Sequence, residues 1–112
     1  ELAGVKPPEE MQGVSLVPLL KGEKPKKWRD ALYYHYYEYP AEHAVRRHYG
    51  IRTDRYKLIH FYNDIDQWEL YDLTADPHEM YNLIDDPAYD RVEKKLRKKL
   101  VALRKEYNVP ED

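Results

Sequence analysis

VRRHYGIRTDRYKLIHFY (residues 45–62) is the stretch that decides the fold of this chain. Its first half alternates between two faces, one with Val45, Arg47, Tyr49 and Ile51 and the other with Arg46, His48, Gly50 and Arg52. A period of two is typical of a β-strand, here with one apolar-leaning and one basic face. Asp54 and Arg55 then separate this strand from a second aromatic and β-branched run at 56–62. The stretch therefore predicts a β-hairpin with strands at 45–53 and 56–62.

Two further strands are expected on either side of this hairpin. Residues 31–39, ALYYHYYEY, are dense in strand-favouring aromatics and stop at Pro40. Residues 68–73, WELYDL, follow the polar turn at 63–67. Because four successive strands with short links usually pair with their sequence neighbours, we expect an antiparallel meander.

The last third of the chain reads as helical. Asp76, Pro77 and Glu79 supply an N-cap acid, a first-turn proline and a capping-box glutamate, which predict a single helical turn. Asp86 and Pro87 predict the start of a longer helix. Its apolar residues recur at helical spacing: Tyr89, Val92, Leu96, Leu100, Leu103 and Tyr107. We therefore predict an α+β fold, with a four-stranded antiparallel sheet and a C-terminal helix packed on one face.

Residues 1–30 are expected to form a connecting arm, because prolines at 7, 8, 18 and 25 disfavour a long helix or a central strand. Within the arm, Ser15 is expected to cap a short helical turn that presents an apolar run at 16–20 to a neighbour. That run would be poorly buried in an isolated domain. The predicted division is thus an arm at 1–30 and a subdomain at 31–112, and the apolar run hints that a neighbouring segment upstream is missing.

Composition excludes several classes of function. The 112 residues allow one modest core, and 19 basic against 21 acidic residues give a formal net charge of −2, without a global field for nucleic acid. No apolar run approaches the roughly 20 residues needed to span a bilayer. The basic face of the C-terminal helix is expected to be solvated rather than to bind nucleic acid or a membrane.

We predict no catalytic residue and no metal site in these residues. The chain has no cysteine, and its one serine, Ser15, lies in the arm without a glycine-flanked elbow. Asp64, Asp66 and Glu69 lack the glycine and the ligand spacing of a calcium loop. The histidines lack the spacing of a zinc site.

The candidate binding residues are two histidines and two arginines within six positions: His43, Arg46, Arg47 and His48. Guanidinium and imidazole donors can bind sulfate or carboxylate groups, and the tyrosines at 31–39 can stack on sugar rings. The alternative is that Arg46 and Arg52 pair with acids of neighbouring strands and that His48 is an ordinary sheet residue. Both interpretations remain open from the sequence.

Five motifs, in order, resemble the C-terminal region of type I, formylglycine-dependent sulfatases. They are 11–22 (MQGVSLVPLLKG), 28–29 (WR), 50–57 (GIRTDRYK), 69–73 (ELYDL) and 76–83 (DPHEMYNL). The stretches HYYEYP and RRHY look most similar to bacterial enzymes that resemble N-acetylglucosamine-6-sulfatases. The resemblance covers nearly the whole chain.

This resemblance implies a longer periplasmic or secreted enzyme that hydrolyses sulfate esters of glycans. Its upstream α/β domain would hold calcium and the formylglycine nucleophile, so these residues alone should be inactive. By analogy with the family, His43 is the first candidate contact to the sugar, followed by Arg46, Arg47 and His48. Two other functions remain open: a stand-alone carbohydrate-binding or interaction module, and the C-terminal part of a related phosphodiesterase or phosphonate hydrolase.

Overall fold

The computed structural model describes residues 1–40 and 44–110, and it divides the chain into two compact units, Glu1–Asp30 and Ala31–Asp112. The first unit holds one short helix, α1 (Val17–Leu20), with Pro18 in its first turn. The Ser15 hydroxyl accepts a hydrogen bond from the Val17 N–H at 3.2 Å. The expected helical turn is therefore present, although its N-cap is Leu16 and Ser15 acts from one position earlier.

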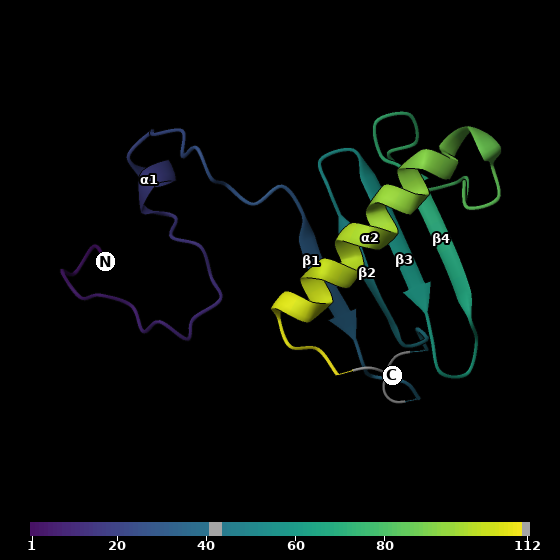
Figure 1. Cartoon of the computed structure of the whole chain (residues 1–112), viewed down its shortest axis with the longest axis horizontal. Helices are drawn as coiled ribbons and strands as arrows, with labels where there is room; N and C mark the ends of the chain where they lie inside the picture. The colour runs from purple at the N-terminus through teal and green to yellow at the C-terminus, as the bar shows by residue number, and fades with distance from the viewer. Residues whose placement is uncertain (41–43, 111–112) are drawn as a thin grey trace. The chain divides into compact units, whose positions relative to one another are not determined.

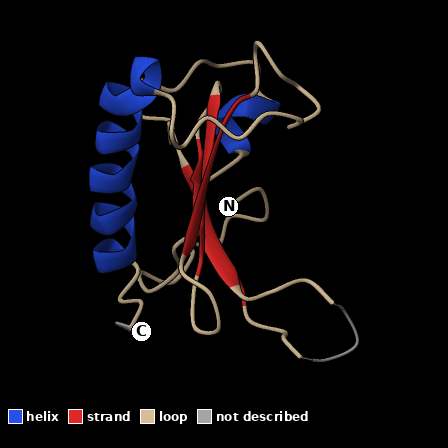
Figure 2. Cartoon of the chain, turned by 90° about the vertical axis from the view of Figure 1, so that its right-hand side faces the viewer, coloured by secondary structure: helices blue, strands red, loops and turns tan. Residues whose placement is uncertain are grey.

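The second unit is a meander of four antiparallel strands in the order β1-β2-β3-β4 (Figure 1). The strands are β1 (Leu32–Tyr36), β2 (His48–Arg52), β3 (Tyr56–Phe61) and β4 (Gln67–Asp72). A 3₁₀ turn, η1 (Pro87–Tyr89), leads into the long helix α2 (Asp90–Glu106), which lies along one face of the sheet (Figure 2). The predicted α+β fold is confirmed.

The first two strands are shorter than the sequence predicted. β1 ends at Tyr36 because the chain turns there, and the Tyr39 N–H donates to the Tyr37 carbonyl at 2.9 Å. The pairing of β1 with β2 begins only at Tyr36 and His48. Residues 45–47 therefore belong to the connection between the two strands rather than to β2.

At Asp76 the structure has a hydrogen-bonded turn rather than a helix, because the Glu79 N–H donates to the Asp76 carbonyl at 3.1 Å and no helical segment follows until η1. Glu79 has φ 54°, a left-handed value that prevents the chain from continuing as a right-handed helix. The Asp76 carboxylate instead accepts from the Tyr81 N–H at 2.9 Å and shapes a loop. Asn82 then accepts from the Leu70 N–H at 2.9 Å, and the Leu83 N–H donates to the Leu70 carbonyl at 2.8 Å, so the returning chain satisfies the outer edge of β4.

The core lies between α2 and the sheet face that contains every second strand residue. Ile51, Leu58 and Leu70 are fully buried there, and Leu96 and Leu100 of α2 pack against them. Burying an aliphatic side chain of this size contributes roughly 1.5–3 kcal/mol. The apolar stripe expected on the helix thus does cover the sheet, and the Asp86 carboxylate accepts from the Ala88 N–H at 2.9 Å at the start of the helical segment, as expected.

The opposite side of the sheet, called here the open face, is not covered by α2. Its residues come from all four strands: Leu32, Tyr34, Tyr36, His48, Gly50, Arg52, Lys57, Ile59, Phe61, Gln67, Glu69 and Tyr71. A Cβ on Gly50 would lie 2.6 Å from the Tyr34 hydroxyl oxygen and 2.5 Å from the Leu58 carbonyl oxygen. Gly50 therefore allows the Tyr34 side chain to lie across the sheet.

Candidate functional site

The antiparallel order places the candidate residues at one end of the sheet. This end, called here the Arg46 end, comprises the described residues of loop 37–47, the turn 62–66 and the adjoining strand ends, of which His48 is one. The other end, called here the Asp72 end, comprises the turn 53–55 and the residues that follow β4. His43, the first candidate of the sequence analysis, lies outside the described residues.

Arg46 links the two connections of the Arg46 end. Its guanidinium forms an ion pair with Asp64 in the turn 62–66 and lies 5.7 Å from the centre of the Tyr39 ring. The Arg46 side chain is 44% exposed and the Asp64 side chain 35% exposed. An ion pair this exposed contributes at most about 1 kcal/mol, so an anionic ligand can compete for the guanidinium at little cost. The ion pair agrees with the alternative interpretation, in which Arg46 pairs with an acidic residue. It is also compatible with the binding of an anionic ligand by Arg46.

Arg47 is fixed by a different segment. Its Nε–H donates to the Tyr37 carbonyl at 2.9 Å, and its own carbonyl accepts from the Tyr62 N–H at 3.3 Å. A guanidinium has five N–H donors, and this bond uses one of them. Arg47 is thereby positioned by loop 37–47 and keeps donors for a ligand.

His48 lies on the open face between aromatic rings. Its ring is stacked with Tyr36 at 5.3 Å between centroids and contacts Phe61 at 5.1 Å. Nδ1 lies 2.8 Å from the Arg46 carbonyl oxygen, which can only accept, so Nδ1 bears a proton. Nε2 can then accept from a hydroxyl in the neutral ring, or donate to an anion in the protonated ring.

Two histidines that the sequence analysis did not single out stabilise the same end from the helix-covered face. His60 lies 2.7 Å from the Asp66 carboxylate and 2.7 Å from the Tyr49 hydroxyl, and its ring stacks on Trp68 at 4.1 Å. These contacts secure the turn 62–66, where a surface hollow is lined by His60, Tyr62, Asn63, Asp64, Ile65 and Asp66.

His35 acts in the same way on the loop that follows β1. Its two ring nitrogens lie 2.9 Å from the Tyr33 hydroxyl and 2.6 Å from the Tyr62 hydroxyl, and its ring stacks on Tyr37 at 3.8 Å. The sequence does contain a signal for the position of these two histidines. Alternation along the strands places His35 and His60 on the same face as Tyr49.

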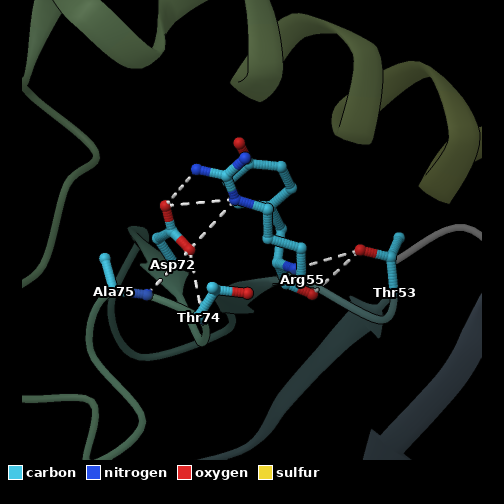
Figure 3. Close-up of polar contacts among 6 residues, drawn as sticks. Thr53, Arg55, Asp72, Thr74 and Ala75 are labelled. Carbon is cyan, nitrogen blue, oxygen red and sulfur yellow. Dashed lines mark hydrogen bonds and ion pairs between the residues drawn. The ribbon is translucent and has the colours of Figure 1, made fainter.

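The Asp72 end is built around an ion pair between the buried Asp72 and the half-exposed Arg55 (Figure 3). Asp72 is only 1% exposed, and the Arg55 guanidinium donates to both of its carboxylate oxygens, from Nη2 at 2.9 Å and from Nε at 3.2 and 3.3 Å. The backbone N–H groups of Thr74 and Ala75 donate to the same carboxylate. Hydrogen bonding from Arg55, followed by these backbone donors, lowers the pKa of Asp72 below its ordinary value although burial opposes the shift. This end has a structural role.

The open face contains two buried hydroxyls that have no hydrogen-bond partner within the described residues, those of Tyr34 and Tyr36. Burial is also the main cause that raises the pKa of Tyr34 above its ordinary value, with the charges of Glu79 and Glu69 adding to it. A buried hydroxyl without a partner costs about 1–3 kcal/mol. The open face is therefore suited to contact a second surface whose groups can accept from, or donate to, these two hydroxyls.

The described residues contain no group of three or more histidine, cysteine or acidic side chains that could bind a metal ion. None of the described helices is long and apolar enough to cross a membrane.

Comparison with known proteins identifies relatives along almost the whole chain. The sequence profile of the family described as N-sulphoglucosamine sulphohydrolase, C-terminal, matches residues 1–106. The chain is 55% identical over 109 residues to an N-acetylglucosamine-6-O-sulfatase of Bacteroides thetaiotaomicron, a match that covers 96% of this chain and 20% of the relative. The chain thus spans about a fifth of that relative's length.

Two solved structures extend the comparison. One, described as a complex with its substrate D-glucosamine-2-N,6-O-disulfate, superposes with a TM-score of 0.90 at 55% identity and covers 95% of this chain and 22% of its own. The phosphonate monoester hydrolase of Agrobacterium radiobacter superposes with a TM-score of 0.68 at 31% identity and covers 84% of this chain and 20% of its own. The fold is therefore shared by enzymes whose names give different reactions.

Proposed function

The chain belongs to the family of N-sulphoglucosamine sulphohydrolase C-terminal domains, and we propose that it completes the substrate pocket of a sulfatase that hydrolyses sulfate esters of glycans. The observation that carries this proposal is the 55% identity, over 96% of the chain, to an N-acetylglucosamine-6-O-sulfatase. Glycosaminoglycan or mucin sugars are the proposed substrate class, and bacterial relatives support a periplasmic or secreted enzyme.

The Arg46 end is the proposed contact to the sugar. Arg46 has only a weak, exposed ion pair to give up, Arg47 keeps guanidinium donors beyond its bond to Tyr37, and His48 offers Nε2. Charge-assisted hydrogen bonds from such groups favour sulfate and carboxylate oxygens over neutral groups. His43, which precedes them in the same loop, is proposed as a further contact. Their contribution is to position the sugar and complement its charge, because the reacting ester bond needs its own acid and base groups.

The proposed partner of the open face is the catalytic α/β domain of a longer polypeptide. The unpartnered hydroxyls of Tyr34 and Tyr36 need acceptors or donors, and relatives in this family are about five times as long as this chain. Docking by the open face would leave α2, on the other side of the sheet, directed away from the catalytic domain.

Calcium and formylglycine do not fit the residues of this chain. It has no cysteine, its serine lies in the arm, and the described residues offer no carboxylate cluster for a metal. We therefore place both groups in the catalytic domain of the longer polypeptide and expect these residues alone to be inactive towards sulfate esters.

The test compares two substrates in the polypeptide that contains this chain. Arg46→Ala and His43→Ala should lower kcat/KM for a glucosamine sulfate by about 10- to 100-fold, the loss expected for one charge-assisted hydrogen bond. The loss for a small aryl sulfate should stay below about 3-fold, because that substrate lacks the sugar groups. Lys26→Ala, which removes an exposed cation from the arm, is the control and should change neither value. Equal losses on both substrates would contradict sugar recognition at this end.

A second candidate function is hydrolysis of phosphonate or phosphate esters, which the similarity to a phosphonate monoester hydrolase favours. The same enzyme preparation decides between the two. Turnover of a sulfate ester at least 100-fold faster than of the matching phosphonate monoester supports a sulfatase, and the reverse order supports the alternative.

A further inference from the structure

The cations of α2 form two groups with different surroundings. Arg97 and Arg104 face the sheet, where their guanidinium carbons lie 3.8 Å from the Trp68 ring centre and 3.9 Å from the Tyr49 ring centre. The Arg97 Nε–H also donates to Glu93 at 2.8 Å. These two residues help to pack the helix on the sheet, since a cation over an aromatic ring contributes about 0.5–2 kcal/mol.

The second group is a row of exposed cations on the outer side of α2, called here the outer row: Arg91, Lys94, Lys95, Lys98 and Lys105. Their spacing of three, four and seven positions places them along one line of the helix, about 21 Å long at 1.5 Å per residue. Within residues 1–40 and 44–110, no acidic side chain forms an ion pair with any of them. The row is thus a positive strip without ion-pair partners, interrupted between Lys98 and Lys105 by the exposed Val101.

Helix stability does not explain the outer row. Like charges three or four positions apart, such as Arg91 with Lys95 and Lys94 with Lys98, destabilise a helix by about 0.2–0.5 kcal/mol per pair. The helix dipole favours cations only in the last turn, and of these five only Lys105 lies there. The like-charge neighbours in the row therefore add no stability to the helix, although Asp90 lies four positions before Lys94 at a favourable spacing.

We propose that the outer row is a binding site for a linear sulfated polysaccharide, separate from the Arg46 end. This inference rests on the proposed function, because it takes the substrate polymer as its ligand. A straight line of flexible ammonium groups matches sulfates repeated along a chain, which each lysine binds as a point charge. In this way the enzyme would stay on the polymer between reactions at its sugar pocket.

Two other polyanions fit the outer row less well. Its residues include no aromatic side chain on which a nucleic acid base could stack. The helix lies along the sheet (Figure 2), and its residues Leu96 and Leu100 are almost fully covered, whereas Val101 is its one large apolar residue that is exposed. A single exposed valine gives too little apolar surface to insert into a lipid surface.

The test measures binding directly, by surface plasmon resonance of the complete polypeptide on immobilised heparin at several salt concentrations. The variant Lys94→Gln/Lys95→Gln/Lys98→Gln should bind at least 10-fold more weakly and show a smaller slope of log affinity against log salt. The control Lys24→Gln/Lys26→Gln/Lys27→Gln removes the same charge from exposed lysines of the arm and should bind as the unmodified protein does. The melting temperature of the α2 variant should be equal to or slightly above that of the unmodified protein, because like-charge repulsion is removed, and that of the control should be unchanged.

Three results would overturn the proposal: equal losses in the two triple variants, unchanged binding in the α2 variant, or equally tight binding to single-stranded DNA or to vesicles with 30% phosphatidylserine. The experiment separates this inference from the proposed function, because turnover of a monosaccharide sulfate is measured on the same preparations. Heparin binding that depends on the outer row in an enzyme without sulfatase activity would refute the proposed function alone. Sulfatase activity without such binding would refute only this inference.

Discussion

The two ends of the sheet each contain an arginine–aspartate pair, but the aspartates differ in burial, whereas both arginines are about half exposed, Arg55 at 56% and Arg46 at 44%. At the Asp72 end, Arg55 binds a carboxylate that is 1% exposed and that also accepts two backbone N–H bonds. At the Arg46 end, Arg46 binds an Asp64 side chain that is 35% exposed. The first pair is part of the fold and cannot be exchanged without loss, whereas the second can yield its guanidinium to a ligand. In the proposed function, the domain thus separates its stability from its binding chemistry along a single sheet.

The largest effect is expected from Asp72→Asn. An amide is neutral and has one acceptor oxygen in place of two, so its NH₂ group would face an N–H donor of Arg55 or of the Thr74 and Ala75 backbone. We expect the free energy of unfolding to fall by about 2–3 kcal/mol, measured by urea unfolding at pH 7. A loss below 0.5 kcal/mol would show that the Arg55–Asp72 pair does not stabilise this end.

The dependence of folding stability on pH should also report the contribution of the Asp72 carboxylate. Because the pKa of Asp72 is lowered in the folded state, its stabilisation is fully present above the unfolded carboxyl pKa of about 4. It is lost as the pH falls below that value towards the folded pKa. Between pH 6 and pH 3, the unmodified protein should therefore lose stability more steeply than Asp72→Asn does. Parallel curves would assign the acid sensitivity to other carboxyl groups.

The smallest effect is expected from Asp64→Asn, the matched change at the Arg46 end. Loss of an exposed ion pair should cost less than about 1 kcal/mol in the same urea experiment. Freed from its partner, Arg46 should bind a sulfated sugar as well as before or better, which KM for a glucosamine sulfate would report. A stability loss as large as that of Asp72→Asn would remove the contrast between the two ends.

Much of the fold could be predicted because the signals are local. Alternation in 45–62 predicted which residues of β2 share a face, and the repeat ending at Tyr107 predicted which residues of α2 cover the sheet. Asp86 was correctly expected to cap the helical segment. The exact ends of the strands were not predicted. The turn after Tyr36 is formed by backbone hydrogen bonds, which do not require any particular type of residue.

The pairings of the site could not be predicted in the same way. Arg55 and Asp72 are 17 positions apart, and with 21 acidic residues in the chain no pattern selects this partner. The left-handed backbone at Glu79, a residue type that rarely adopts it, likewise gave no signal. Arg46, Arg47 and His48 were found because they are adjacent in the sequence. Their binding role, and that of His43, stays a prediction.

The most direct test of the separation between the ends is to measure glycan turnover and melting temperature together in Arg46→Ala and Asp72→Asn versions of the complete enzyme. We predict that Arg46→Ala loses at least 10-fold in kcat/KM for a glucosamine sulfate while its melting temperature changes by less than about 2 °C. Asp72→Asn should melt several degrees lower, yet keep near-normal turnover at a temperature where it is folded. If Arg46→Ala instead melts lower and keeps its turnover, the Arg46 end is structural and the account is contradicted.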